Sequence, residues 1–406
     1  MSISRRDFIT VSAAALAVPT TAVALPTRPN AVRVEDNRFD PWIEVDSLAI
    51  QHNVRAIAAR VGNRPILAVV KNNAYGLGLT TVGPILDRCD EIVELAVVKV
   101  DQALALRAAG VAKPILLMGH FDEEIGVELA EHGISLAPFT DEAIRVLPLV
   151  AQRTDREIPV HLYLDTGMSR LGLDYERAIP WIEQIARLDR VRIKGTFSGL
   201  TEADDFDAEQ LRRLLEVAHQ AGQRGLDLGS LHLASSHALY HRPECFLDMV
   251  RPGLVLYGAH PAGAQEAGQA ELRPAFRLRA RVVRVERVEP GDSVSYGRNY
   301  VAERPIWIAT LPVGHADGYP REAVNGCEVL VGDRTYPVIG AVSASHTILE
   351  LGPEKTVQVG DVATLLGPDS PEVHPNTVAE RAEISVYDVL MHLGSGLPKV
   401  IADGSF

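Results

Sequence analysis

The pattern of hydrophobic and polar positions changes along the chain, and its first part alternates between two periods. Short apolar runs bounded by turn residues precede longer segments of helical period. Several of the helical segments begin on Asp or Ser and end on Gly, which are common capping residues. The apolar runs number eight and cover residues 66–71, 95–98, 114–118, 134–137, 159–165, 192–198, 230–236 and 249–257.

Eight short strands that alternate with helices are typical of an eight-stranded (β/α) barrel. We therefore expect an α/β fold in which residues 41–262 form such a barrel. An open doubly wound sheet is the alternative. Its glycine-rich fingerprint does not follow the first apolar run, so the barrel is favoured.

From about residue 272 onward the helical period gives way to alternation. In "FRLRARVVRVERV" apolar and polar residues alternate with period two, and later runs are separated by turn glycines. Alternation of this kind is typical of half-buried strands. The sequence therefore predicts a mostly-β C-terminal domain over residues 272–406.

The first 24 residues have a different character. Arg5 and Arg6 stand just before an alanine-rich apolar run, which ends at the small-x-small stretch Ala22-Val23-Ala24. This combination is typical of a twin-arginine signal peptide over residues 1–24, and a hydrophobic first helix is the alternative. We expect export to the periplasm. No later segment has the roughly 18 consecutive apolar residues of a membrane span, so we expect none in the mature protein.

Composition limits the classes of partner. The chain has 406 residues, enough for two domains, and a formal net charge of −13. A nucleic-acid surface requires a basic face, so we expect small-molecule or protein partners. The three cysteines, Cys89, Cys245 and Cys327, form no metal or redox motif, and we predict no metal site. Buried packing is the first interpretation of these cysteines, and one disulfide is the alternative.

A lysine at the end of the first apolar run is the first sign of chemistry. Lys71 closes "ILAVVK", and barrel active sites lie where strands end. Desolvation there favours a neutral amine, which can form an imine with an aldehyde. A lysine that merely reaches solvent is the alternative. The loops after strands seven and eight usually build a phosphate site. Here they offer hydroxyls and backbone amides at Ser235, Ser236, Arg251, Gly253 and Leu254. A lysine and a phosphate site together suggest pyridoxal 5′-phosphate (PLP).

Five motifs in order then resemble those of the alanine racemase family. "AVVKNNAYGLG" resembles the family's cofactor-lysine motif, and the others are "LDTGMSRLGL", "VRPGLVLYG", "SVSYGRNYVAE" and "LPVGHADGYPR". The resemblance covers nearly everything after residue 40. It implies a PLP-binding barrel followed by a β domain, which is the order that the two hydrophobic patterns predict.

The resemblance also implies roles for individual residues. Lys71 would carry PLP and act as one base, while Tyr296 from the partner subunit of a homodimer would be the second base. Two bases on opposite faces of one Cα are what racemisation requires. The phosphate would be bound by Tyr75, Ser236, Gly253 and Leu254.

Two arginines complete the implied site. Arg251 would face the pyridine nitrogen, to which an always-protonated guanidinium cannot give a proton, so the ring would be a weaker electron sink. Arg170 would bridge the cofactor's phenolic oxygen and the substrate carboxylate.

Several positions depart from the family pattern. Tyr163 stands in place of a lysine that is often carbamylated, and Gly199 in place of a histidine that links the pyridine-facing arginine to the catalytic tyrosine. His315 replaces a tyrosine at the substrate entrance. Ala344 and Ser345 replace a Met-Asp pair that walls the substrate pocket.

These departures leave several functions open. Lost bulk at the entrance and wall favours a racemase of broad specificity that accepts alanine and larger amino acids. A conventional alanine racemase with altered supporting groups is an alternative. In either case the changes at Tyr163 and Gly199 would remove supports of the catalytic groups and slow the reaction. A lyase or dehydratase of the same fold type acting on D-amino acids, and a PLP- or amino-acid-binding protein with little turnover, are further alternatives. A lyase does not need Tyr296 as a second base.

Overall fold

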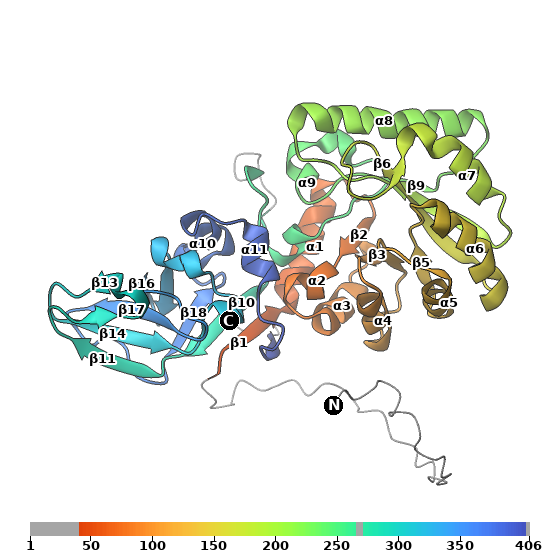
Figure 1. The fold of residues 1–406 in the computed structure, drawn as a ribbon. Coiled ribbons are helices and arrows are strands. Elements are labelled where there is room, and N and C mark those ends of the chain that lie inside the picture. The colour runs from red at the N-terminus through yellow and green to blue at the C-terminus, as the bar shows by residue number, and fades with distance from the viewer. Residues whose placement is uncertain (1–39, 265–270, 403–406) are drawn as a thin grey trace, which may run out of the picture.

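The computed structural model describes residues 40–264 and 271–402. The predicted signal peptide, residues 1–24, lies outside the described residues. The chain forms a barrel followed by a mostly-β domain, and the two lie side by side (Figure 1). This confirms the fold class that the sequence predicts.

Seven parallel strands form most of the barrel. Their order in the sheet follows the chain, and a short strand β7 (Leu173–Asp174) pairs with β6 at one side. The runs are almost entirely buried because helices cover their outer face. The seven strands are β2 (Ile66–Val69), β3 (Ile92–Val97), β4 (Ile115–Leu117), β5 (Ile134–Leu136), β6 (Ile158–Asp165), β8 (Val191–Phe197) and β9 (Ser230–His232).

The eighth predicted strand, residues 249–257, is wrong over most of its length. Met249 bridges His232 of β9, and Val250 bridges Ile66 of β2, so these two residues close the ring. Pro252, which has no N–H, ends the pairing, and its carbonyl accepts from the amide of Val69 at 2.8 Å. The rest of the run is a 3₁₀ helix over Leu254–Tyr257.

Helices surround the barrel as the pattern predicts. Side chains of Asp46, Asp122 and Thr140 accept a hydrogen bond from the third amide of the helix that each one caps. The helices are α1 (Ser47–Arg60), α3 (Leu79–Asp87), α4 (Val100–Ala108), α5 (Glu123–Glu131), α6 (Asp141–Thr154), α7 (Ala178–Ala186), α8 (Asp204–Gln223) and α9 (Ala238–His241).

The C-terminal domain is built on a sheet of nine strands, in the order β11-β14-β17-β16-β15-β18-β10-β1-β19. All neighbours are antiparallel except β1 and β19. The strands after the barrel are β10 (Phe276–Arg281), β11 (Arg284–Val288), β14 (Ile306–Leu311), β15 (Glu328–Val331), β16 (Arg334–Ile339), β17 (Thr347–Gly352), β18 (Val362–Leu366) and β19 (Lys399–Ala402). A hairpin of β12 (Ser293–Val294) and β13 (Tyr300–Val301) and two helices, α10 (Pro375–Arg381) and α11 (Val386–Met391), complete it.

The first strand of the structure belongs to this second sheet. β1 (Trp42–Asp46) falls in the range 41–262 expected for the barrel, yet it lies between β10 and β19. The C-terminal domain therefore contains both ends of the described chain.

Two further expectations concern the state of the cysteines and the presence of a membrane-spanning helix. Cys89, Cys245 and Cys327 are free and buried, as the packing interpretation predicts. Burial raises the pKa of the Cys89 thiol to about 11. Across residues 40–264 and 271–402, no helix combines the length and apolar content needed to cross a bilayer.

Candidate active site

A left-handed turn follows the first barrel strand. β2 ends at Val69, so Lys71 is not the last residue of a strand as predicted but the first residue of the short helix α2 (Lys71–Tyr75). The φ angles of residues 72–75 lie between +52° and +57°, a region that costs non-glycine residues about 1–2 kcal/mol each. The turn therefore needs support from outside.

The support comes from asparagine side chains and from the second domain. Asn73 Oδ1 accepts from the amide of Leu79 at 2.8 Å, and Asn72 Nδ2 lies 3.3 Å from Met391 Sδ of α11. Figure 1 shows α11 beside α2, at the junction of the two domains. The turn brings Lys71 and Tyr75, four residues apart, to the wall of one cavity.

This cavity has a volume of about 280 Å³ and lies at the carboxyl ends of the barrel strands. Six predicted site residues line it, namely Lys71, Tyr75, Arg170, Ser236, Arg251 and Gly253. Ser235 lines it too, as do Tyr163 and Gly199, the positions that depart from the expected pattern. The side chain of Leu254 is instead buried in the core.

The surroundings of Lys71 lower the pKa of its amine. Burial lowers the pKa of its amine, and the positive charge of Arg170 lowers it further, while Glu202 opposes them. Among the described residues the amine has no hydrogen-bond partner. A larger share of the amine is therefore neutral, and free to accept a proton, than for a lysine in water.

The far end of the cavity forms a small polar cup. The Gly253 amide donates to Ser236 Oγ at 3.0 Å, and the neighbouring Ser235 Oγ is buried with no partner among the described residues. A Cβ on Gly253 would lie 2.1 Å from Tyr75 Oη, so only glycine lets the tyrosine hydroxyl approach. Hydroxyls and close backbone are what an anionic group such as a phosphate requires. The residues fit the phosphate of PLP.

Arg251 forms the base of the cavity. Its Nη2 donates to the carbonyl of Ser198 at 2.6 Å, its Nη1 lies 3.1 Å from His232 Nδ1, and its guanidinium lies over Phe197, 5.0 Å from the ring centroid. Burial lowers the pKa of Arg251 to about 10, so the group remains a cation at neutral pH.

The substituted positions Tyr163 and Gly199 meet beside Arg170. A Cβ on Gly199 would lie 3.9 Å from both Arg170 Nη2 and Tyr163 Oη, and 3.3 Å from Met168 Sδ. Tyr163 is held by stacking on Phe197, with ring centroids 4.3 Å apart. Beside Arg170 these two positions therefore supply aromatic packing and a close backbone approach, and no ionised side chain.

The other four predicted site residues, Tyr296, His315, Ala344 and Ser345, lie elsewhere, on the C-terminal domain. Ser295 Oγ donates to the carbonyl of Ala341 at 2.8 Å, and the His315 amide to the carbonyl of Ser343 at 3.0 Å. One loop, residues 341–346, therefore joins these residues into a single cluster, which we call the Tyr296 face. None of its residues lines the barrel cavity.

Comparison with known proteins decides the family. The model of the alanine racemase N-terminal domain matches residues 45–261, and that of the alanine racemase C-terminal domain matches residues 275–401. The chain belongs to the alanine racemase family. It is a racemase by this assignment, which confirms the family and enzyme class that the five motifs predict.

Relatives and solved structures agree with this. The chain is 33% identical to an alanine racemase of Desulforamulus reducens, over 88% of this chain and 98% of the other. It is similar to the alanine racemase structure of a D-cycloserine-producing Streptomyces lavendulae, with TM-score 0.84, 29% identity and coverage of 90% and 98%. An alanine racemase of Bacillus anthracis with bound L-Ala-P has TM-score 0.81, 27% identity and coverage of 91% and 96%.

Sequence reasoning missed several cavity residues, among them Tyr387 and Glu202. Tyr387 comes from α11, and its ring centroid lies 6.3 Å from that of Tyr75. Glu202 lies just before α8 with a φ of +62°. Neither stands in one of the five racemase motifs, and only the domain packing brings Tyr387 to the barrel.

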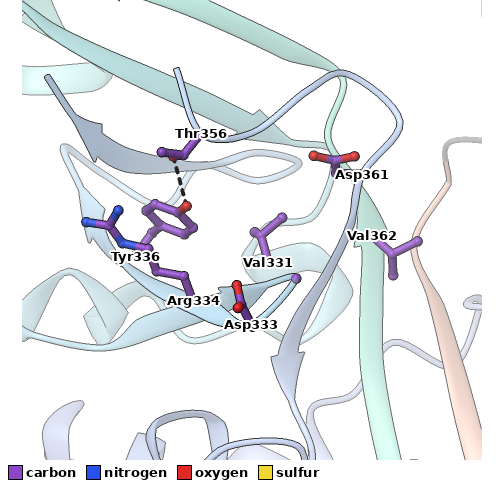
Figure 2. Close-up of a pocket in the computed structure, with 8 residues that line it drawn as sticks. Val331, Asp333, Arg334, Tyr336, Thr356, Asp361 and Val362 are labelled. Carbon is purple, nitrogen blue, oxygen red and sulfur yellow. Dashed lines mark hydrogen bonds between the residues drawn. The ribbon is translucent and has the colours of Figure 1, made fainter. Parts of the chain in front are cut away.

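Another hollow lies on the C-terminal domain, away from the barrel cavity. It has a volume of about 490 Å³ and surrounds the turn between β15 and β16 (Figure 2). In it Tyr336 Oη donates to Thr356 Oγ1 at 2.8 Å. It contains no residue of the predicted site, so the barrel cavity is the candidate active site.

The close contact at Gly253 gives a prediction. We expect Gly253→Ala to weaken PLP binding by about 10-fold or more, because the new methyl group displaces Tyr75 and overpacking costs roughly 1–3 kcal/mol. Absorbance titration of the apo protein with PLP measures this affinity. Gly222→Ala in α8, where a Cβ meets no atom within 4 Å, is the matched control. Equal affinities for the two variants would contradict the proposed cup.

Proposed function

We propose that the protein is a PLP-dependent amino-acid racemase that works as a homodimer with active sites shared between subunits. The observation that carries this proposal is the division of the predicted site. One half lines the barrel cavity, and the other forms the Tyr296 face on the second domain. Figure 1 places the β12–β13 hairpin, which carries Tyr296, at the end of that domain away from the barrel.

The exposure of Tyr296 supports this arrangement. Its side chain is 75% exposed, although large aromatic residues are usually well covered. It lies on a turn whose neighbours Ser295 and Arg298 have φ angles of +64° and +53°. Strained backbone persists where the surrounding structure holds it, often at functional sites. A second subunit would cover this tyrosine and receive its hydroxyl.

The cavity residues suit the proposed cofactor. Lys71 would hold PLP, the cup of Tyr75, Ser236 and Gly253 with the backbone at Leu254 would hold its phosphate, and Arg251 would face its ring nitrogen. Bound PLP would supply an electron sink for the carbanion left when a Cα proton is removed.

The chain's own residues would then move the proton. Lys71, with its lowered pKa, takes a Cα proton from one face, and Tyr296 of the partner subunit gives or takes one at the opposite face. Arg170, beside Lys71, binds the substrate carboxylate and keeps the Cα between the two bases. Exchange of a proton between opposite faces inverts the configuration, which is a racemase reaction rather than a lyase reaction.

The Tyr296 face also bears on the substrate. His315 and Ala344, on adjoining loops, are smaller than the residues that the family pattern has there. A substrate pocket rejects large amino acids when bulky side chains in its wall occupy the space that they would need. Smaller side chains at these two positions leave that space open. We therefore propose that the enzyme accepts alanine and also larger amino acids.

Shared sites can be tested by complementation. Lys71→Ala and Tyr296→Phe should each lose roughly 10²–10⁴-fold in rate as homodimers. Co-expressed, half of the dimers are hybrids with one intact site out of two, so activity should return to about one quarter of wild type. The measurement is racemisation by the unfractionated mixture, and hybrids isolated through two different tags should reach about half of wild type. If both bases came from one chain, every hybrid site would lack one base and the mixture would stay inactive.

The substrate proposal predicts that the enzyme racemises several of the amino acids in a test panel. We expect at least one amino acid larger than serine to be racemised with a kcat/KM comparable to that of alanine, measured by chiral chromatography. A methylene that gains apolar cover is worth about 0.8 kcal/mol, and pockets discriminate by only about 10–200-fold per methylene. Ala344→Met with His315→Tyr should restore an alanine preference. Turnover of alanine alone by the native protein would refute the proposal.

We also propose that the enzyme works in the periplasm. The support is the sequence of residues 1–24, with Arg5 and Arg6 before the apolar run. Replacement of both arginines by lysine keeps the charge but removes the twin-arginine recognition element. The full-length variant should remain in the cytoplasmic fraction while the native chain reaches the periplasm. Equal distribution of the two would argue against this route.

A further inference from the structure

A line of buried polar side chains crosses the interior of the barrel, beginning at Arg251. Arg251 Nη1 lies 3.1 Å from His232 Nδ1, and His232 Nε2 lies 3.0 Å from His161 Nδ1. His161 Nε2 lies 3.3 Å from Glu94 Oε2. All four residues are at least nine-tenths buried, with exposed fractions of 8%, 0%, 2% and 6% in this order. We call this set the histidine chain.

The histidine chain links the two ends of the barrel. Arg251 lines the active-site cavity, whereas Glu94 and His161 line a different cavity of about 620 Å³. That second cavity is bordered by residues that begin strands, such as Pro114 and Ser230, so it lies at the amino ends of the strands. A charge at Glu94 is therefore placed to act on the active site from the opposite end.

The donors of Arg251 at one end and the acceptor of Glu94 at the other favour the same arrangement of hydrogens in the histidine chain. A guanidinium only donates, so Nδ1 of His232 must accept and its proton must be on Nε2. This proton points to His161, whose Nδ1 must then accept. His161 must therefore be neutral with its own proton on Nε2, which faces the carboxylate of Glu94. Burial lowers the pKa of His161 to about 4, which agrees with a neutral ring.

Glu94 is the last residue of the histidine chain, and its carboxylate relies on His161 as a partner. In the described part of the chain, His161 is the only cationic or titratable basic side chain within ion-pair distance of the carboxylate. Arg107 lines the same cavity, but its guanidinium already donates to four backbone carbonyls, at 2.7–3.0 Å. Lys194 lies instead 3.9 Å from Glu157. The Ser135 side chain also favours the ionised carboxylate by hydrogen bonding. A buried carboxylate without a strong cationic partner is still costly, so stability alone gives a poor reason for it.

We infer that Glu94 is a positioning residue: its carboxylate holds the tautomers of His161 and His232, and through them orients the Arg251 guanidinium that faces the cofactor site. A carboxylate behind a histidine fixes the ring and strengthens it as an acceptor. Without an acceptor at position 94, the Nε2–H of His161 is buried and unpaired, and this cost favours moving the proton to Nδ1. The proton of His232 would then have to move from Nε2 to Nδ1, where its N–H would face the N–H of Arg251 Nη1. The inference rests on the proposed function for its effect on turnover only.

The first test uses the native full-length chain. Protein labelled with ¹⁵N at histidine, without added PLP and at pH 8, should show His161 and His232 both neutral and both protonated on Nε2. The pH is chosen because burial raises the pKa of Glu94 to about 7. Loss of each signal in His161→Gln and His232→Asn assigns them. A charged ring, or a proton on Nδ1 of either residue, would overturn the inference, and this result requires no activity.

Two variants then distinguish the role of Glu94 as a hydrogen-bond acceptor from its contribution to packing. Glu94→Gln keeps an acceptor oxygen, whereas Glu94→Met has a similar length and none. We expect the Nε2–H tautomers to persist in the first variant and to be lost at His161 or His232 in the second. Glu44→Gln is the matched control, a buried carboxylate of the other domain, 3.1 Å from Arg279. It should leave both tautomers unchanged. Unchanged tautomers in Glu94→Met would show that Glu94 does not position them.

Kinetics of the PLP-loaded enzyme provide the second readout. Loss of an outer supporting group of this kind typically costs about 10–100-fold, so Glu94→Met should lower kcat by about 10-fold. KM should change by less than about threefold, because Arg170 binds the substrate carboxylate independently. An unchanged kcat would overturn the inference. If the native protein racemises nothing, the proposed function fails, and the tautomer measurements still decide the role of Glu94.

Discussion

A permanent cation buried in the barrel is the constraint around which the active site is arranged. Arg251 is 8% exposed, and its guanidinium cannot be neutralised at neutral pH as a buried lysine can. Its donors are met by the carbonyl of Ser198, the ring of His232 and the face of Phe197. Each of these acceptors is neutral. The positive charge is therefore stabilised without a carboxylate in direct contact, and it stays available to the cavity above it.

The same charge shapes the neighbouring groups. Arg251 lowers the pKa of both His161 and His232, in addition to the larger effect of burial. Across the cavity, Arg170 lowers the pKa of Lys71. The two arginines thus lower the basicity of nearby groups through their positive charge. An amine of lowered pKa and neutral imidazoles beside fixed cations give a site whose protonation is biased before any ligand enters.

Much of the fold was predictable because its signals are local. Seven of the eight apolar runs are strands, since continuous burial gives a continuous apolar run. The eighth was wrong after Val250 because 3₁₀ helices and strands can have the same apolar content. The left-handed turn at residues 72–75 was not predicted either. Asparagines permit that conformation, but contacts from α11 in the other domain stabilise it.

Six of the residues that the motifs predict for the site do line one cavity, since most of these lie within a few residues of a strand end. The motifs did not predict Tyr387, which reaches the barrel only through domain packing. Nor did they indicate the histidine chain. Glu94, His161 and His232 lie on β3, β6 and β9, and Arg251 follows the bridge at Val250. Their contact depends on inward-facing side chains of non-adjacent segments. Sequence reasoning that treats one segment at a time has no means of finding such a set.

The position of β1 has a consequence for how the protein is made. This strand leaves the ribosome before the barrel, but its sheet partners β10 and β19 begin at residues 276 and 399. Loop closure over such separations is slow, and the first strand must wait while the barrel forms between it and its partners. The C-terminal sheet can be completed only after nearly the whole chain has been synthesised. A protein stopped before residue 399 would expose the edge of β1 that β19 normally pairs, which is a site for aggregation.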